Sequence, residues 1–195
     1  EGFRMYQRHN LNNANIKFQL SKMKKWADLG FIVNYLARII EGIRIGLIYK
    51  LENSHNVIVY SASDFWMDCL PCFILKLRYP QIRWVAGWYQ TAPLPWKGFS
   101  EGEREERYYM SSLLYWLMQL PMKPIIGNMA DLIMINNESE RLVFPKKDKE
   151  GRLMVVLGAV DVRGIKNWKV KLKYQTKVYD AVFQGRFHPQ KGVVE

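Results

Sequence analysis

Cysteine and long hydrophobic runs are both scarce in this sequence of 195 residues. Its two cysteines, Cys69 and Cys72, are too few for the disulfide framework of a small secreted protein. The most apolar window, residues 111–122, is interrupted by Pro121 and followed by Lys123, and is too short to span a bilayer. We therefore expect an intracellular, cytoplasmic protein without a transmembrane segment.

Acidic residues are outnumbered by basic ones. The chain has 29 Lys and Arg against 18 Asp and Glu, a net charge of +11 and a pI near 9.6. Such an excess implies an acidic partner, which can be nucleic acid, anionic lipid or a phosphorylated small molecule, and it does not choose between them. With 49% hydrophobic and 14% aromatic residues, the chain can form a sizeable folded core.

Apolar segments typical of strands alternate with segments of helical periodicity. We predict strands at 16–20, 56–62, 82–89, 131–136 and 153–160, and helices at 31–51, 64–79, 105–127 and 137–144. This order predicts an α/β fold: a Rossmann-like parallel sheet with helices on both faces. Ligands of such sheets bind beyond the carboxyl ends of the strands.

Several boundaries are predicted from individual residues. The strand at 56–62 is continuously apolar, which predicts burial on both of its faces. Ser63 and Asp64 are placed to cap the helix that follows, and Asn137 to cap the short helix that Pro145 closes. Proline and glycine predict an irregular loop at 90–103.

The spacing of Cys69 and Cys72, C-L-P-C, is that of a thioredoxin-type redox pair. Asp64 and Asp68 lie close by, and their carboxylates disfavour a thiolate. We therefore predict that both cysteines are packing residues, with a thiol oxidoreductase as an alternative function.

The last residues predict a site for an anion. Residues 180–184 form a short apolar strand, Gly185 allows a turn, and an apolar run after Gly192 is expected to open a helix. Backbone amides at a helix N-terminus, together with Arg186 and Lys191, would form a diphosphate site. An exposed basic turn has a similar composition, so the residues alone leave both interpretations open.

This last segment, GRFHPQKGVVE, resembles the start of the donor-binding domain of family 4 glycosyltransferases. Three further stretches follow the order of that family: SASDFWMDCLP, ADLIMINNESER and VVLGAVDV. The resemblance implies a retaining enzyme of the GT-B fold. Residues 1–175 would then form the acceptor-side domain, and 176–195 the first strand and phosphate loop of the donor domain.

The resemblance also implies roles for individual residues. Gly185, Arg186 and Lys191 match the family positions that hold the donor diphosphate, whereas Tyr89 and Gln90 stand in the acceptor loop where members commonly carry a histidine. The implied substrates are a nucleotide-sugar and a sugar or lipid-linked acceptor, with no metal and no further cofactor. The catalytic residues are not identified. We expect a chain truncated at both ends and inactive alone, since further family elements would lie outside it.

Two binding partners follow from apolar and aromatic residues. The helix around 108–122 is apolar on more than one face, so with the basic charge we predict peripheral attachment to an anionic membrane, on its inner face; burial in the core is the rival interpretation. A basic module that binds nucleic acid through Trp84, Trp88 and Trp96 is the other alternative. Because Trp84 and Trp88 are expected to pack inside, no specific nucleic acid is expected.

Overall fold

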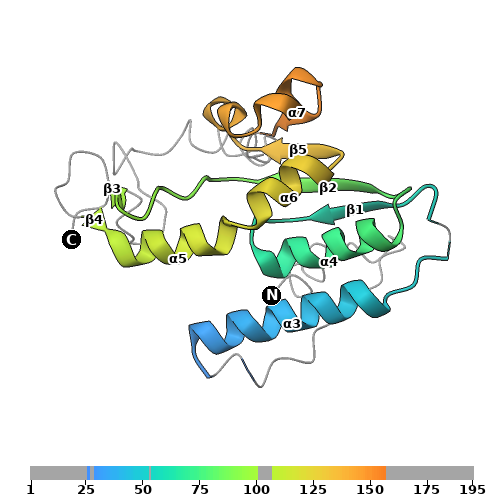
Figure 1. Cartoon of the computed structure of the whole chain (residues 1–195), viewed down its shortest axis with the longest axis horizontal. Coiled ribbons are helices and arrows are strands. Elements are labelled where there is room, and N and C mark those ends of the chain that lie inside the picture. The colour runs from blue at the N-terminus through green and yellow to red at the C-terminus, as the bar shows by residue number, and fades with distance from the viewer. Residues whose placement is uncertain (1–25, 27–28, 53, 101–106, 157–195) are drawn as a thin grey trace, which may run out of the picture.

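The computed structural model describes residues 26, 29–52, 54–100 and 107–156. Its elements, in chain order, are α3 (Phe31–Ile48), β1 (Ile58–Ser61), α4 (Trp66–Arg78), β2 (Arg83–Trp88), β3 (Phe99–Ser100), β4 (Arg107–Tyr108), α5 (Tyr109–Gln119), α6 (Met122–Met129), β5 (Leu132–Ile135), η1 (Glu138–Val143), α7 (Pro145–Lys149) and β6 (Leu153–Val155). Four strands form one parallel sheet in the order β1-β2-β5-β6, flanked by helices (Figure 1). The predicted α/β class and Rossmann-like parallel sheet are confirmed.

The core lies around the two central strands, β2 and β5. Trp84, Ala86 and Trp88 of β2 are buried, as are Ile133 and Ile135 of β5. Burying large apolar side chains of this kind contributes roughly 1.5–3 kcal/mol each. The expectation that Trp84 and Trp88 pack inside is confirmed.

Strand β1 corrects the prediction of burial on both faces. Val59 packs against the core, whereas Ile58 is 65% exposed and Tyr60 is also exposed. β1 ends the row of described strands, and successive side chains of a strand point to opposite faces, so its apolar run is buried on one face alone.

Helix α3 lies outside α4, so the layers run from the sheet through α4 to α3 (Figure 1). The two helices approach closely where α3 carries glycines. A side-chain carbon added at Gly42 would lie 3.3 Å from the ring of Pro71, and one at Gly46 would lie 2.9 Å from Cβ of Ile74. The absence of side chains at these glycines therefore allows α3 to pack against α4.

The predicted cap of α4 is wrong. The helix begins at Trp66 with Phe65 as its N-cap residue, and no side chain caps it. Ser63 Oγ instead accepts a hydrogen bond from the Phe65 N–H at 3.3 Å and donates one to the Asp68 carboxylate at 2.5 Å. The side chain of Asp64 takes a different partner, Gln119. Because both polar side chains are engaged elsewhere, they do not cap the helix.

Other boundaries differ in detail. The helix predicted at 105–127 is two helices, α5 and α6, because Pro121 has no N–H with which to continue the first. The loop predicted as irregular contains β3, which pairs antiparallel with β4. Asn137 caps η1 as predicted: its side-chain oxygen accepts from the Glu140 N–H at 3.1 Å. The strand predicted at 16–20 and everything from 157 onward lie outside the described residues.

Candidate functional site

The loop after β2 lies at the carboxyl edge of the sheet, where parallel sheets bind their ligands. We call residues 89–92 the acceptor loop, after the role that the resemblance implies for Tyr89 and Gln90. Side chains from α5 and η1 hold its backbone from two directions. The loop backbone is therefore held in place by side chains of two other elements.

Gln119, at the end of α5, holds one side of the acceptor loop. Its side-chain oxygen accepts from the Ala92 N–H at 2.7 Å, and its Nε2 donates to the Gln90 carbonyl at 2.6 Å. The same Nε2 also donates to the buried carboxylate of Asp64. A single buried amide thus joins the segment after β1 to the segment after β2.

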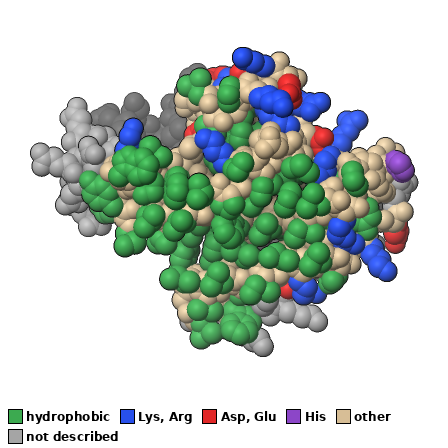
Figure 2. Space-filling view, in the orientation of Figure 1, with side chains coloured by type: hydrophobic (Ala, Val, Ile, Leu, Met, Phe, Trp, Pro, Cys, Tyr) green, Lys and Arg blue, Asp and Glu red, His purple; other side chains and the backbone are tan. Residues whose placement is uncertain are grey.

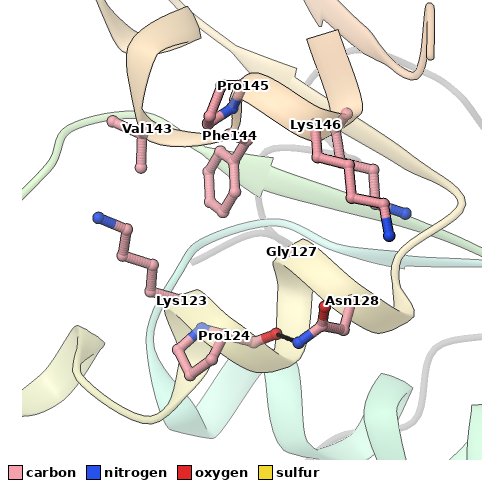
Figure 3. Close-up of a pocket in the computed structure, with 9 residues that line it drawn as sticks. Lys123, Pro124, Gly127, Asn128, Val143, Phe144, Pro145 and Lys146 are labelled. Carbon is pink, nitrogen blue, oxygen red and sulfur yellow. Dashed lines mark hydrogen bonds between the residues drawn. The ribbon is translucent and has the colours of Figure 1, made fainter. Parts of the chain in front are cut away.

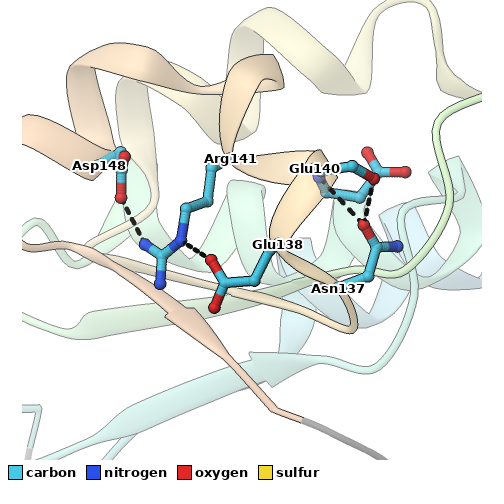
Figure 4. A network of polar contacts seen from close by, with 6 residues as sticks. Asn137, Glu138, Glu140, Arg141 and Asp148 are labelled. Carbon is cyan, nitrogen blue, oxygen red and sulfur yellow. Dashed lines mark hydrogen bonds and ion pairs between the residues drawn. The ribbon is translucent and has the colours of Figure 1, made fainter.

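Glu140, from η1, holds the other side. Its carboxylate accepts from the Thr91 N–H at 3.1 Å and from the Thr91 hydroxyl at 2.5 Å. The Thr91 hydroxyl oxygen in turn accepts from the indole N–H of Trp88 at 2.9 Å. The cap at Asn137 orients the turn that carries Glu140, and Arg141 bridges Glu138 and Asp148 in the same network (Figure 4).

Asp64 has unusual electrostatics for an aspartate. Burial raises its pKa to about 6, the negative charges of Glu140 and Asp68 act in the same direction, and the hydrogen bond from Gln119 opposes them. The carboxyl group is nearly inaccessible to solvent. The Asp64 carboxyl group therefore keeps its proton to a higher pH than an ordinary aspartate does.

Tyr89 makes a hydrogen bond through its side chain, and Gln90 makes one through its backbone. The hydroxyls of Tyr60 and Tyr89 are hydrogen-bonded at 2.5 Å, and this bond, with partial burial, raises the pKa of Tyr89 to about 12. The Tyr89 hydroxyl therefore stays protonated and is tied to β1. Gln90 contributes its backbone carbonyl to Gln119.

A cavity of about 120 Å³ lies beside the acceptor loop. Its lining residues are Trp88, Thr91, Ala92, Leu94, Trp116, Gln119, Leu120 and Lys123. Lys123 also lines a second cavity of about 300 Å³ between α6 and the η1–α7 segment, together with Lys146 and Lys147 (Figure 3). Apolar walls with a few lysines suit a ligand that carries both a hydrophobic surface and a negative charge.

The other predicted site residues fall into two groups. Gly185, Arg186 and Lys191 lie outside the described residues. Cys69 and Cys72 are free and buried, and burial raises the pKa of Cys72 to about 12 and that of Cys69 further. Their thiols stay protonated and pack in the core, as expected. Among the described residues, no group of three or more His, Cys, Asp and Glu could hold a metal ion.

Sequence analysis missed Gln119, Thr91 and Glu140 as parts of a site. Thr91 and Glu140 each lie a few residues beyond the end of a strand, and position after a parallel strand is the signal that could have selected them. Gln119 gave no such signal, because it lies at the end of an apolar helix and contacts the loop through tertiary packing.

No family model, curated protein or solved structure matches this chain. Within the described ranges, none of the helices combines the length and the apolarity that crossing a membrane requires.

Proposed function

We propose that this chain is part of a glycosyltransferase that moves a sugar from a nucleotide-sugar donor to an acceptor hydroxyl with retention of configuration. The observation that carries the proposal is the sequence at 180–192, in which a short apolar segment, a glycine turn and the pair Arg186 and Lys191 precede an apolar run. The parallel α/β sheet supports it, because this architecture binds nucleotides and phosphates at strand ends.

In this proposal the donor diphosphate is held by the 185–192 segment. When the bond between the sugar and the diphosphate breaks, negative charge builds up on the leaving phosphate oxygens. Arg186 and Lys191 would stabilise that charge more in the transition state than in the ground state, and so accelerate the reaction.

The acceptor would lie at the acceptor loop. Its hydroxyl oxygen forms the new bond to the sugar carbon on the face from which the nucleoside diphosphate departs, and its proton passes to the departing phosphate oxygen. Gln119 and Glu140 already bind the loop backbone at Gln90, Thr91 and Ala92. They are therefore proposed as positioning residues, which fix the loop against which the acceptor docks.

Calorimetric titration with a nucleoside diphosphate tests the donor site. Arg186→Ala and Lys191→Ala each remove one charge-assisted hydrogen bond, so we expect weaker diphosphate binding and, in the longer enzyme that the resemblance implies, a fall in turnover of roughly two orders of magnitude. Lys149→Ala, which removes an exposed lysine at the end of α7, is the control with unchanged binding. Unchanged diphosphate affinity in both variants, with normal melting, would place the donor site elsewhere.

A second arm of the experiment tests the acceptor loop. Gln119→Leu removes the partners of the Ala92 N–H and the Gln90 carbonyl, so we expect turnover to fall by at least about tenfold while diphosphate affinity stays unchanged. Gln81→Leu, on the surface, is the matched control. Equal losses of diphosphate binding and turnover in the Gln119 variant would contradict a role confined to the acceptor side.

A further inference from the structure

Two helices expose apolar side chains that the core does not use. On α3 these are Phe31, Ile32, Leu36 and Ile40, and on α5 they are Met110, Leu114 and Leu117. We call this surface the α3–α5 face; Figure 2 shows hydrophobic side chains gathered in a continuous area across one side of the molecule. The exposed fractions of Ile32 and Met110 are 66% and 68%. An apolar surface of this kind marks an interaction site more often than ordinary solvent-exposed structure.

The face contains a groove between the two helices. The groove has a volume of about 360 Å³ and is lined by Phe31, Ile32, Tyr35, Leu36, Ile39, Trp66, Leu114, Leu117 and Met118. None of these residues is charged, so the groove suits a hydrocarbon group and offers no ion pair to a charged one.

Helix α3 packs against α4 with its opposite side, so the side chains of the α3–α5 face point outward. The glycines Gly42 and Gly46 already hold α3 against α4, so the helix does not need its opposite side for attachment to the fold. Both Phe31 and Ile32 lie in the first turn of α3, well exposed. The outer side chains of α3 are therefore available to a partner without disturbing the core.

Charge favours a lipid bilayer over a second copy of the chain. Helix α5 has no charged residue, and on α3 Arg44 pairs with Glu41 at 2.7 Å while Arg38 adds a positive charge. Lys and Arg side chains lie along the upper and right edges of the apolar area in Figure 2, with a few Asp and Glu side chains among them. Since the whole chain carries +11, two copies repel each other, whereas an anionic lipid surface attracts the chain.

Exposed aromatic side chains on α5 and on the loop bound to it fit the same partner. Trp96 is 68% exposed next to Lys97, in the loop that Ser112 of α5 holds by donating to the Pro93 carbonyl at 3.1 Å. Tyr109, at the start of α5, is also exposed. Tryptophan and tyrosine concentrate where a membrane meets water, because each has an apolar ring and a polar tip.

We propose that the α3–α5 face docks on the surface of an anionic lipid bilayer, with the groove taking up hydrocarbon from the leaflet. The helices lie in the interface and do not cross it. The docking surface stands independently of the proposed reaction, because it uses none of the residues assigned to donor or acceptor.

Sedimentation with lipid vesicles tests the proposal. The probes are vesicles of phosphatidylcholine alone and vesicles of equal parts phosphatidylcholine and phosphatidylglycerol, at about 0.15 M salt. We expect the protein to sediment with the phosphatidylglycerol vesicles and not with the neutral ones. Ile32→Glu combined with Leu117→Glu should weaken partitioning at least about tenfold, since each apolar side chain contributes more than 1.4 kcal/mol when buried.

Leu142→Glu is the matched control, because Leu142 is 86% exposed on η1, outside the face, and it should leave binding unchanged. Hydrogen exchange on the unsubstituted protein gives a second measurement, in which vesicles should protect amides of α3 and α5 and not those of α7. Equal binding by the double variant, equal loss in the control, or unprotected amides in α3 and α5 would each overturn the proposal. So would sedimentation velocity showing that the face joins two copies without lipid.

Vesicle binding is measured without nucleotide, and diphosphate binding without vesicles. Failure of the membrane proposal therefore leaves the donor-site test unaffected, and failure of the donor-site test leaves the membrane proposal unaffected.

Discussion

At the scale of single residues, the buried side chain of Asp64 leads to a specific prediction about stability and pH. The sequence predicts a capping role for Asp64, whereas in the structure Asp64 is buried and its carboxylate accepts a hydrogen bond from Gln119. Capping was the ordinary inference from a Ser-Asp pair before a helix. The sequence could not predict the outcome, because the partner of Asp64 lies 55 residues away and reaches it through the packing of α5.

Asp64→Asn should change how stability depends on pH. With a folded pKa of about 6 and an ordinary value of 3.8, Asp64 binds its proton more tightly in the folded state, so stability falls as pH rises from about 4 to about 6. Asparagine keeps an oxygen for Gln119 without the charge. We therefore expect the variant to be more stable than the native protein at pH 7.5 by up to about 3 kcal/mol, and to lose that advantage at pH 4.

Urea unfolding at the two pH values measures the effect. Glu52→Gln, which neutralises an exposed carboxylate, is the control for net charge. The same difference between the Asp64 variant and the native protein at both pH values would mean that Asp64 ionises normally in the folded state.

At the scale of elements, the periodic segments were predictable and the edges were not. The runs at 82–89 and 131–136 became β2 and β5 because mostly apolar sequence suits strands in the middle of a covered sheet. The same argument was wrong for β1, since position within a sheet is decided by topology and not by the strand itself. The helix predicted at 105–127 divides at Pro121. The sequences before and after this proline both favour helix, so one long helix was predicted.

The close contact between α3 and α4 at Gly46, which we call the seam, gives a prediction at this scale. In a free helix, Gly46→Ala would raise stability by about 1 kcal/mol, but in this fold the new carbon would lie 2.9 Å from Cβ of Ile74. Because that atom is fixed to the α4 backbone, the helices must separate, and we expect a net loss of about 1–3 kcal/mol in unfolding free energy.

Gly127→Ala in α6 is the control, since its nearest neighbour, a ring carbon of Phe144, would be 3.4 Å away and in ordinary contact. Thermal melting followed by circular dichroism compares the two variants. A Gly46 variant as stable as the Gly127 variant would show that the seam can widen without cost.

At the scale of the whole molecule, composition predicted a type of partner but not its place. A charge of +11 pointed to an acidic surface, and the apolar helix at 108–122 pointed to a membrane or to the core. The structure places one side of this helix inside and leaves the other exposed, because Ser112 and Gln119 of α5 are buried while Met110 and Leu117 are exposed. In a helix that is apolar on several sides, the side that faces inward depends on neighbouring elements such as α6. The local sequence pattern does not encode that choice.

The groove of the α3–α5 face ends close to the acceptor loop. Trp66 borders the groove two residues after Asp64, and Met118 borders it directly before Gln119. Under the proposed function, a bilayer docked on this face would hold a lipid-linked acceptor so that its hydroxyls lie at a fixed height above the membrane plane. Acceptors with longer spacers between lipid and sugar should then be glycosylated at positions nearer the lipid, which mass spectrometry of the products would detect; an unchanged position would show that height does not select it.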